Sequence, residues 1–219
     1  SSNWMTIAGA QTTAYLQAGS IGDAVVFDDV AVGNFNLTLA TNVAPASITA
    51  SNDLNDYTIA GSFGIGGAGN LTKSGAARLT LATSNTYAGG TLVLGGTLQA
   101  GTGGVFCAVG SGSITNHASL VFHHGDVATQ AVAIGGTGSL IKEGAGTLTL
   151  AAFNTYTNMT TVNGGTLELA ANAGSAGTLS GPLTINTGAV VVTTVATALH
   201  YLATPCLRQT NPNDPPQAT

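Results

Sequence analysis

Charged residues are scarce in this sequence. Only 6% of its 219 residues are Asp, Glu, Lys or Arg, about a quarter of the usual share. Four basic residues and a net charge of −5 leave no basic surface that could neutralise phosphates, so we expect no nucleic-acid partner. Because Lys and Glu are strong helix formers, their scarcity and the abundance of Thr, Val and Gly favour strands and turns.

Cysteines and long apolar runs are also few. Cys107 and Cys206 lie far apart, and no CxxC spacing suggests a metal site. The two cysteines could form one disulfide or stay as buried free thiols, and the free thiol is the commoner outcome. The apolar run from Ala189 to Ala203 is shorter than the ~20 residues that span a bilayer, so we predict no membrane span in this chain.

Motifs of the common enzyme classes are missing. The sequence has no GxSxG, no phosphate-binding GKS/T loop and no HExxH. A glycosidase needs two acids that flank one bond, but Asp28 and Asp29 are neighbours that would point to opposite faces of a strand. Asp53 and Asp56 lie in a turn-rich segment, where such side chains usually bind backbone groups. We therefore predict no enzymatic activity and no cofactor.

The stretch FHHGD is the one cluster that resembles a metal site. It places His123, His124 and Asp126 close together, with His117 six residues before His123. Adjacent histidines on a strand face opposite ways, so at most one could share an ion with Asp126. A catalytic zinc needs about three protein ligands, and we therefore predict that no metal is bound.

The sequence does contain a long internal repeat. Residues 67–100 and 136–169 align without gaps, and about 19 of some 34 paired positions are identical. Apolar residues alternate within short runs such as LTL, which predicts half-buried strands. The glycines between these runs predict turns with unusual backbone angles. These glycines are Gly69, Gly75, Gly95 and Gly96, which recur as Gly138, Gly144, Gly164 and Gly165.

The backbone hydrogen bonds of near-identical strands at this long spacing are best satisfied when equivalent strands stack in parallel. We therefore predict an all-β fold, a right-handed parallel β-helix (β-solenoid) of about nine turns with about 20 to 25 residues each. Hydrogen bonds between the main chains of successive turns would hold it together without charged side chains. The expected parts are a cap or assembly segment (1–20), the coil (21–189), apolar terminal turns or an inter-subunit segment (190–209) and a Pro-rich tail (210–219).

The most specific polar residues of the repeat lie in the tripeptide NTY, at Asn85–Tyr87 and Asn154–Tyr156. One interpretation is ligand binding by the asparagine and the tyrosine. The interpretation we favour is that the asparagine binds local backbone groups and the tyrosine covers the apolar interior. Lys73 and Lys142 also recur, and we expect them to be solvated turn residues whose stems lie over apolar surface.

Both copies follow the pattern GxLxKxGxxxLTLxxxNTYxxxTxVxGGTL. This pattern resembles the autotransporter-associated β-strand repeat of bacterial surface proteins, and the upstream stretches GDAVVFDD, APASIT and YTIAGSFGIGG resemble sequence that precedes such repeats. The resemblance implies a secreted, right-handed parallel β-helix, an extracellular or cell-surface location, and no catalysis by the repeat. The second copy departs from the family at Asn158 and Met159, which replace the usual glycine pair.

These features together predict a non-enzymatic, extracellular structural or adhesive protein that assembles head to tail into a filament. Its partners would be further copies of the chain and ligands on a host surface, glycans included. The expected assembly contacts are Trp4, Val190, Val192, Leu199, Tyr201 and Leu202, which lie outside the repeat. The alternative is a carbohydrate-binding or carbohydrate-cleaving β-helix, which would need an aromatic groove that 5% aromatic residues hardly supply.

Overall fold

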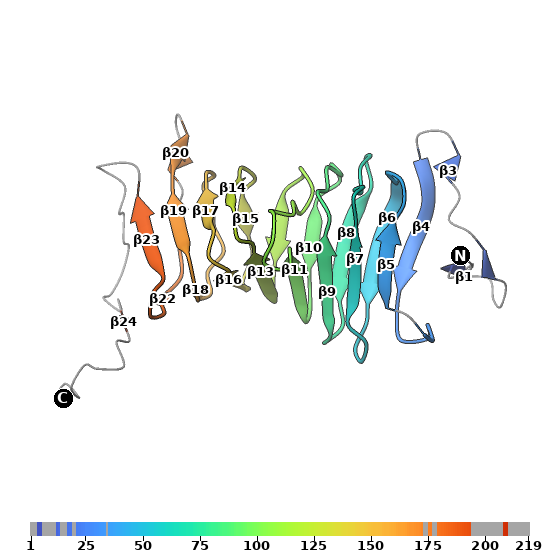
Figure 1. The fold of residues 1–219 in the computed structure, drawn as a ribbon, viewed down its shortest axis with the longest axis horizontal. Helices are drawn as coiled ribbons and strands as arrows, with labels where there is room; N and C mark the ends of the chain where they lie inside the picture. The colour runs from blue at the N-terminus through green and yellow to red at the C-terminus, as the bar shows by residue number, and fades with distance from the viewer. Residues whose placement is uncertain are drawn as a thin grey trace.

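The chain forms one long parallel β-coil, shown in Figure 1 as a computed structural model. The residues described are 21–33, 35–172 and 179–193, together with short strands at 4–5, 12–13, 17–18, 175–176 and 208–209. From β4 to β23, the strands follow one another along the long axis of the molecule in chain order (Figure 1). The predicted all-β parallel solenoid is confirmed at this level, while its right-handed sense stays a prediction.

Three sheets make up the sides of the coil. The first contains β3 (Gln17–Ala18), β4 (Ile21–Phe27), β6 (Pro45–Ser51), β8 (Asn70–Ser74), β10 (Thr91–Val93), β12 (Ile114–Asn116) and β15 (Ile134–Gly135). The second contains β5 (Asn36–Leu39), β7 (Tyr57–Gly61), β9 (Arg78–Ala82), β11 (Thr97–Ala100), β13 (Ser119–His123), β16 (Ser139–Glu143), β18 (Thr160–Val162), β22 (Leu183–Ile185) and β24 (Arg208–Gln209). The third contains β14 (Val127–Gln130), β17 (Thr147–Leu150), β19 (Thr166–Leu169) and β23 (Val190–Thr193).

Successive turns stack in register. Thr91 pairs in parallel with Leu71 in the turn before it and with Ile114 in the turn after it. The coil makes about seven turns, so the predicted number of about nine was wrong. That number divided the whole chain by the length of a turn, whereas the strands between β4 and β23 occupy residues 21–193.

Inward-facing leucines, isoleucines and valines fill the interior. Alternation puts every second residue of a strand inside, as in β8, where Leu71 is buried and Thr72 is half-buried. Each fully buried leucine stabilises the fold by about 1.5 to 3 kcal/mol relative to an exposed one. The leucines shared by both copies are all buried: Leu71, Leu79, Leu81 and Leu98, and Leu140, Leu148, Leu150 and Leu167.

The two repeat copies are rotated relative to each other by one side of the coil. β8 belongs to the first sheet, but its equivalent in the second copy, β16, belongs to the second sheet. The prediction that equivalent strands stack was therefore wrong for the two copies. Stacking occurs within each copy instead, where β10 lies on β8 and β18 lies on β16. The reason is register, since the copies lie about three and one-third turns apart.

Only half of the predicted turn glycines have a left-handed backbone. Gly75, Gly96, Gly144 and Gly165 have φ values of +79°, +61°, +79° and +64°. At Gly69 the constraint is steric instead, because a Cβ atom would lie 2.1 Å from the carbonyl oxygen of Pro45 in the turn below. Glycine is thus required by close stacking as well as by backbone angle.

The apolar segment after the repeat begins as part of the coil. β23 pairs in parallel with β19, and Val190 and Val192 lie on its outer face with 48% and 39% of their surface exposed. Leu199, Tyr201, Leu202 and the tail at 210–219 lie outside the described residues. Among the residues that are described, no helix combines the length and the apolar character needed to cross a membrane.

Candidate functional site

The asparagine of the NTY tripeptide is an internal link between turns. Asn85 is 1% exposed. Its Oδ1 accepts hydrogen bonds from the amide of Ile65 (3.0 Å) and the hydroxyl of Thr83 (2.9 Å). Its Nδ2 donates to the carbonyl oxygens of Thr83 and Ala108, both at 2.9 Å. Ile65 and Ala108 belong to the turns on either side, so one amide group joins three successive turns.

Asn154 repeats this arrangement in the second copy. It is also 1% exposed, its Oδ1 accepts from the amide of Ile134 at 2.9 Å, and its Nδ2 donates to the carbonyl of Ala152 at 2.9 Å. Such a buried amide cannot face a ligand outside the coil. The structural interpretation of both asparagines therefore fits the geometry, although their main partners lie across turns and not only in the local backbone.

The tyrosines of NTY fill the interior below the asparagines. Tyr87 and Tyr156 are 1% and 0% exposed. The hydroxyl groups of Tyr87 and Thr91 are 2.8 Å apart, and those of Tyr156 and Thr160 are 2.6 Å apart. Burial raises the pKa of both phenols. Both tyrosines are therefore neutral, hydrogen-bonded core residues that are out of reach of solvent.

Lys73 and Lys142 are fully buried, so the prediction that they are solvated was wrong. Lys73 is 0% exposed, and its Nζ donates to the carbonyl oxygens of Ser74 (2.5 Å), Gly75 (2.9 Å) and Gly95 (3.4 Å). The three hydrogens of an ammonium group match three carbonyl acceptors. Gly95 lies in the turn above, so the lysine ties two successive turns together.

The second lysine makes the same contacts. Lys142 Nζ donates to the carbonyl oxygens of Glu143 (2.8 Å), Gly144 (2.9 Å) and Gly164 (3.3 Å). Burial lowers the pKa of both lysines. The sequence did contain a signal for this placement, because a lysine two residues after an inward leucine lies on the same face of the strand.

The histidine cluster is organised around one buried ring. His124 is 0% exposed, and its Nδ1 lies 3.2 Å from Asp126 Oδ1, while Nε2 has no hydrogen-bond partner. Burial and the charge of Lys142 lower the pKa of His124. In the part of the chain that the structure describes, no three His, Cys, Asp or Glu residues are placed to hold a metal ion.

His124 lies against Gly144 of the second copy as Asn52 lies against Gly75 of the first, each in the turn that precedes the copy. A Cβ atom on Gly75 would lie 2.3 Å from the carbonyl oxygen of Asn52, and one on Gly144 would lie 2.3 Å from that of His124. Both side chains leave one buried polar atom unpaired, Oδ1 in Asn52 and Nε2 in His124. The equivalence depends on the register of the turns, which the sequence alignment alone does not reveal.

The acidic residues serve as caps between turns. Asp28 and Asp29 were expected on a strand, but they lie just after β4 ends at Phe27. Asp29 accepts hydrogen bonds from the backbone amides of Asp53, Leu54 and Asn55 at 2.7 to 3.1 Å. The amide of Asp53 is the main cause that lowers the pKa of Asp29. Asp53 and Asp56 in turn accept from the backbone amides of Ala76 and Arg78. The geometry thus pairs these acids with backbone groups.

Cys107 is buried and its thiol is free, with a pKa raised mainly by burial. A raised pKa keeps the thiol protonated and therefore unreactive. Cys206, with which a disulfide was considered, lies outside the described residues.

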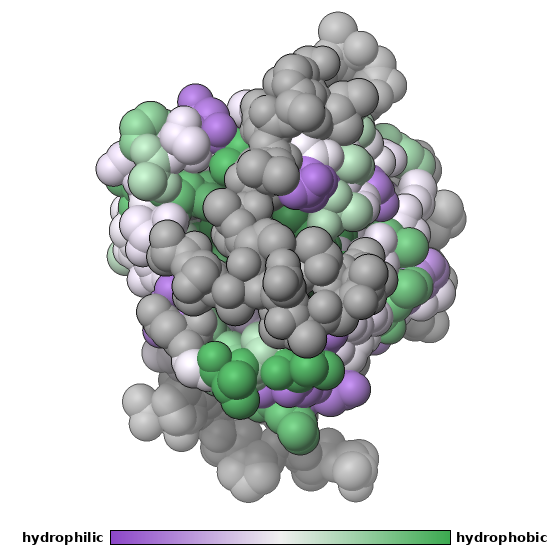
Figure 2. Space-filling view, turned by 90° about the vertical axis from the view of Figure 1, so that its right-hand side faces the viewer, coloured by the Kyte–Doolittle hydropathy of each residue, from purple (hydrophilic) through white to green (hydrophobic). Residues whose placement is uncertain are grey.

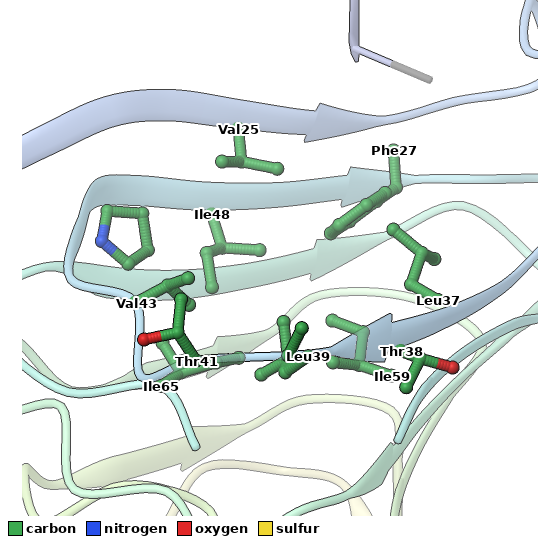
Figure 3. A pocket seen from close by; sticks show the side chains of 12 residues that line it. Val25, Phe27, Leu37, Thr38, Leu39, Thr41, Val43, Ile48, Ile59 and Ile65 are labelled. Atoms are coloured by element: carbon green, nitrogen blue, oxygen red, sulfur yellow. The ribbon is translucent and has the colours of Figure 1, made fainter. Parts of the chain in front are cut away.

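An apolar hollow of about 250 Å³ lies at the N-terminal end of the coil. Val25 and Phe27 of β4, Leu37 and Leu39 of β5, and Ile48 of β6 contribute to its lining. Val25 and Ile48 are paired positions of parallel strands, and both point to the side where Leu39 lies (Figure 3). Figure 2 faces this end, and a group of strongly hydrophobic residues lies in the lower part of the view. Sequence reasoning did not locate this hollow, because it depends on which strands come first in the stack.

Comparisons with known proteins give two matches, which cover different parts of the chain. A family model described as the passenger-associated-transport-repeat matches residues 71–100 and 140–169. A stretch of 136 residues is 39% identical to the adhesin BmaC autotransporter of Brucella suis biovar 1 (strain 1330). That match covers 56% of this chain but 4% of the adhesin, so the chain spans only a small part of its relative. No solved structure matches the chain.

The matched residues coincide with the geometry described above. Each segment begins at the first inward leucine of its copy, Leu71 or Leu140, and contains the buried lysine, the NTY tripeptide and three of the four turn glycines. The chain therefore carries two copies of the passenger-associated-transport-repeat and is distantly similar to an autotransporter adhesin.

Proposed function

We propose that the protein is an adhesive, non-enzymatic segment of an extracellular bacterial surface protein. The observation that carries the proposal is that the specific polar residues of both repeats lie inside the coil and hold its turns together. Only the outer faces and the turns are then left for contact with a partner. Passenger-associated-transport-repeats imply a secreted or surface location, and the relative is named as an adhesin.

The outer turns offer apolar side chains for such contact. Val105 and Val127 are 75% and 78% exposed. Val105 and Val127, the first residue of β14, belong to segments that lie side by side, because the amide of Gly125 donates to the carbonyl of Gly104 at 2.7 Å. Neighbouring exposed apolar side chains are a feature of protein interaction sites. We expect the partner to be a protein on a host-cell surface, bound through these two neighbouring segments.

The test displays the full chain on a non-adherent bacterial strain and counts the bacteria retained on cultured mammalian cells. We expect retention above that of the same strain without the chain. The double variant Val105→Ser/Val127→Ser should lose most of this retention. The control variant Val26→Ser removes an apolar side chain that is 44% exposed at another place and should keep it. Retention equal to that of the empty strain contradicts the proposed function.

Head-to-tail assembly into a filament remains part of the sequence-based prediction. It requires that the end of the coil be open to another copy of the chain. The apolar hollow at the N-terminal end is a surface that such a contact would cover.

A further inference from the structure

The connecting segment, residues 101–113 between β11 and β12, is bound to two neighbouring turns. Its second half is held by the turn before it, where Asn85 Nδ2 donates to the carbonyl oxygen of Ala108 at 2.9 Å. Its first half is held by the turn after it, because the amide of Gly125 donates to the carbonyl oxygen of Gly104 at 2.7 Å. A loss of the contacts to the later turn would therefore release the first half alone.

The carboxylate of Asp126 joins the connecting segment to a buried histidine. Its Oδ2 accepts a hydrogen bond from the amide of Phe106 at 3.0 Å, and its Oδ1 lies 3.2 Å from Nδ1 of His124. The rings of Phe106 and His124 pack nearly at right angles, with their centroids 5.5 Å apart. Because Phe106 is half-buried and His124 is fully buried, the phenyl ring helps to screen the histidine from solvent.

The neutral form of His124 carries its proton on Nδ1. This nitrogen lies 3.1 Å from the carbonyl oxygen and 3.2 Å from Oδ1 of Asp126, and these oxygens only accept hydrogen bonds. Nε2 then holds a lone pair, and among the described residues it has no hydrogen-bond partner. A second proton at Nε2 would therefore create a buried N–H donor without an acceptor, which is costly in an apolar interior.

The charged groups around His124 also disfavour its protonated form. Burial of the ring and the charge of Lys142, which lies in the next turn, lower the pKa of His124. Asp126 favours protonation, but 40% of its side chain is exposed, so water screens its charge. In the connecting segment, burial raises the pKa of Cys107, so its thiol stays neutral. Two further titratable groups in these turns pair with each other at 3.7 Å and are partly exposed: His123 and Glu143.

A protonated His124 can reach an acceptor in water, and Phe106 is part of the layer that keeps water away from it. We propose that protonation of His124 in mild acid displaces Phe106, breaks its hydrogen bond to Asp126 and releases the first half of the connecting segment. Asp126 itself stays ionised in mild acid, because the amide of Phe106 is the main cause that lowers its pKa. Val105 belongs to the released half and Val127 to the turn that it leaves, so release separates the two exposed valines. The consequence for adhesion rests on the proposed function, whereas the release of the segment does not depend on it.

Cys107 makes the release measurable in the full chain. Its side chain is buried in the connecting segment, and its Sγ lies 3.5 Å from the carbonyl oxygen of Val105. Dithiodipyridine labels accessible thiols in mild acid as well as at neutral pH, and peptide mass spectrometry measures the labelling of Cys107 separately from that of Cys206. In the released segment, His124 should titrate at its ordinary pKa of about 6.5. From about pH 7.5 to about pH 5.5, the labelling rate relative to a short cysteine peptide should therefore rise several-fold, up to about tenfold.

Two histidine variants separate this cause from a general effect of acid. His124→Asn should abolish the rise, because an asparagine side chain does not titrate. His123→Asn, a change at a partly exposed position one residue away, should keep it. Far-UV circular dichroism checks that the coil stays folded at both pH values. A labelling rate that does not rise, that rises equally in both variants, or that rises only as β-structure is lost would overturn the proposal.

The count of retained bacteria tests the effect on binding. Retention by the unchanged chain should be several-fold lower at about pH 5.5 than at about pH 7.5, while bacteria that display His124→Asn should be retained equally at both. Retention that falls equally for both chains would overturn the link between release and adhesion. A chain that is retained at neither pH contradicts the proposed function, and the labelling of Cys107 still decides whether the segment is released.

Discussion

Replacement of Asn85 by alanine should destabilise the coil more than any substitution on its surface. The variant leaves the amide of Ile65 without its acceptor and the carbonyl of Ala108 without its donor. A buried polar group that loses its partner costs about 1 to 3 kcal/mol. With these two groups unpaired, we expect the free energy of unfolding to fall by about 3 to 5 kcal/mol.

Asn85→Asp tests the donor role of Nδ2 separately, because it keeps an acceptor oxygen and removes the amide donor. Its second carboxylate oxygen would take the place of Nδ2 and face the carbonyl oxygens of Thr83 and Ala108. At neutral pH we expect a larger loss than for alanine, because a buried charge would lack a donor on that side. Burial would raise the pKa of the new carboxyl group, so protonation should restore part of the stability as the pH falls.

Urea denaturation followed by far-UV circular dichroism measures these losses, and hydrogen exchange of the Ile65 amide measures them locally. The local measurement matters because turns of a solenoid contact only their neighbours and can open separately. The matched control is Asn158→Ala, since Asn158 is exposed. An Asn85→Ala variant within about 0.5 kcal/mol of the unchanged chain, the range of ordinary surface substitutions, would refute the reasoning.

Three further predictions follow from the interior. Gly96→Ala should lower stability by about 2 to 4 kcal/mol in thermal unfolding, because φ is +61° and a Cβ atom would lie 2.4 Å from a carbonyl oxygen. Gly104→Ala, where nothing lies within 4 Å, should have little effect. Lys142→Met should cost about 1 to 3 kcal/mol in urea unfolding, since three hydrogen bonds are lost while the burial of a charge is relieved. Because the pKa of His124 is lowered, the unfolded chain binds the proton more readily. Stability should then fall below about pH 6.5 by up to about 1.4 kcal/mol per pH unit. This slope should disappear in His124→Asn and persist in His123→Asn, and a slope equal in both variants would contradict the assignment.

The architecture could be predicted because its causes are local and repeated. Alternating leucines in LTL runs, separated by glycines, predicted half-buried strands, and the long identical blocks predicted parallel stacking. The buried position of Lys73 was also encoded, since Leu71 and Lys73 occupy the same face of β8. The prediction failed there because the usual preference of charged groups for solvent was given more weight than the alternation.

Other features depend on register, which one sequence does not specify. The partners of Asn85 lie 20 and 23 residues away, and only the stacking of turns identifies them. The equivalence of Asn52 and His124 has the same origin, because the turns differ slightly in length. The hollow could not be predicted either, since it is formed by the meeting of β4, β5 and β6 at one end of the stack.

The rotation between the two repeats determines how the molecule presents itself to a partner. Identical outward residues of the two copies point in directions that differ by about a third of a full rotation around the coil axis, because the copies occupy successive sides of a three-sided coil. A rigid, flat receptor that recognises one copy therefore cannot touch the other at the same time. A chain with further copies at this spacing would return to the original direction with the fourth, so avidity would need an array or a partner that winds around the rod.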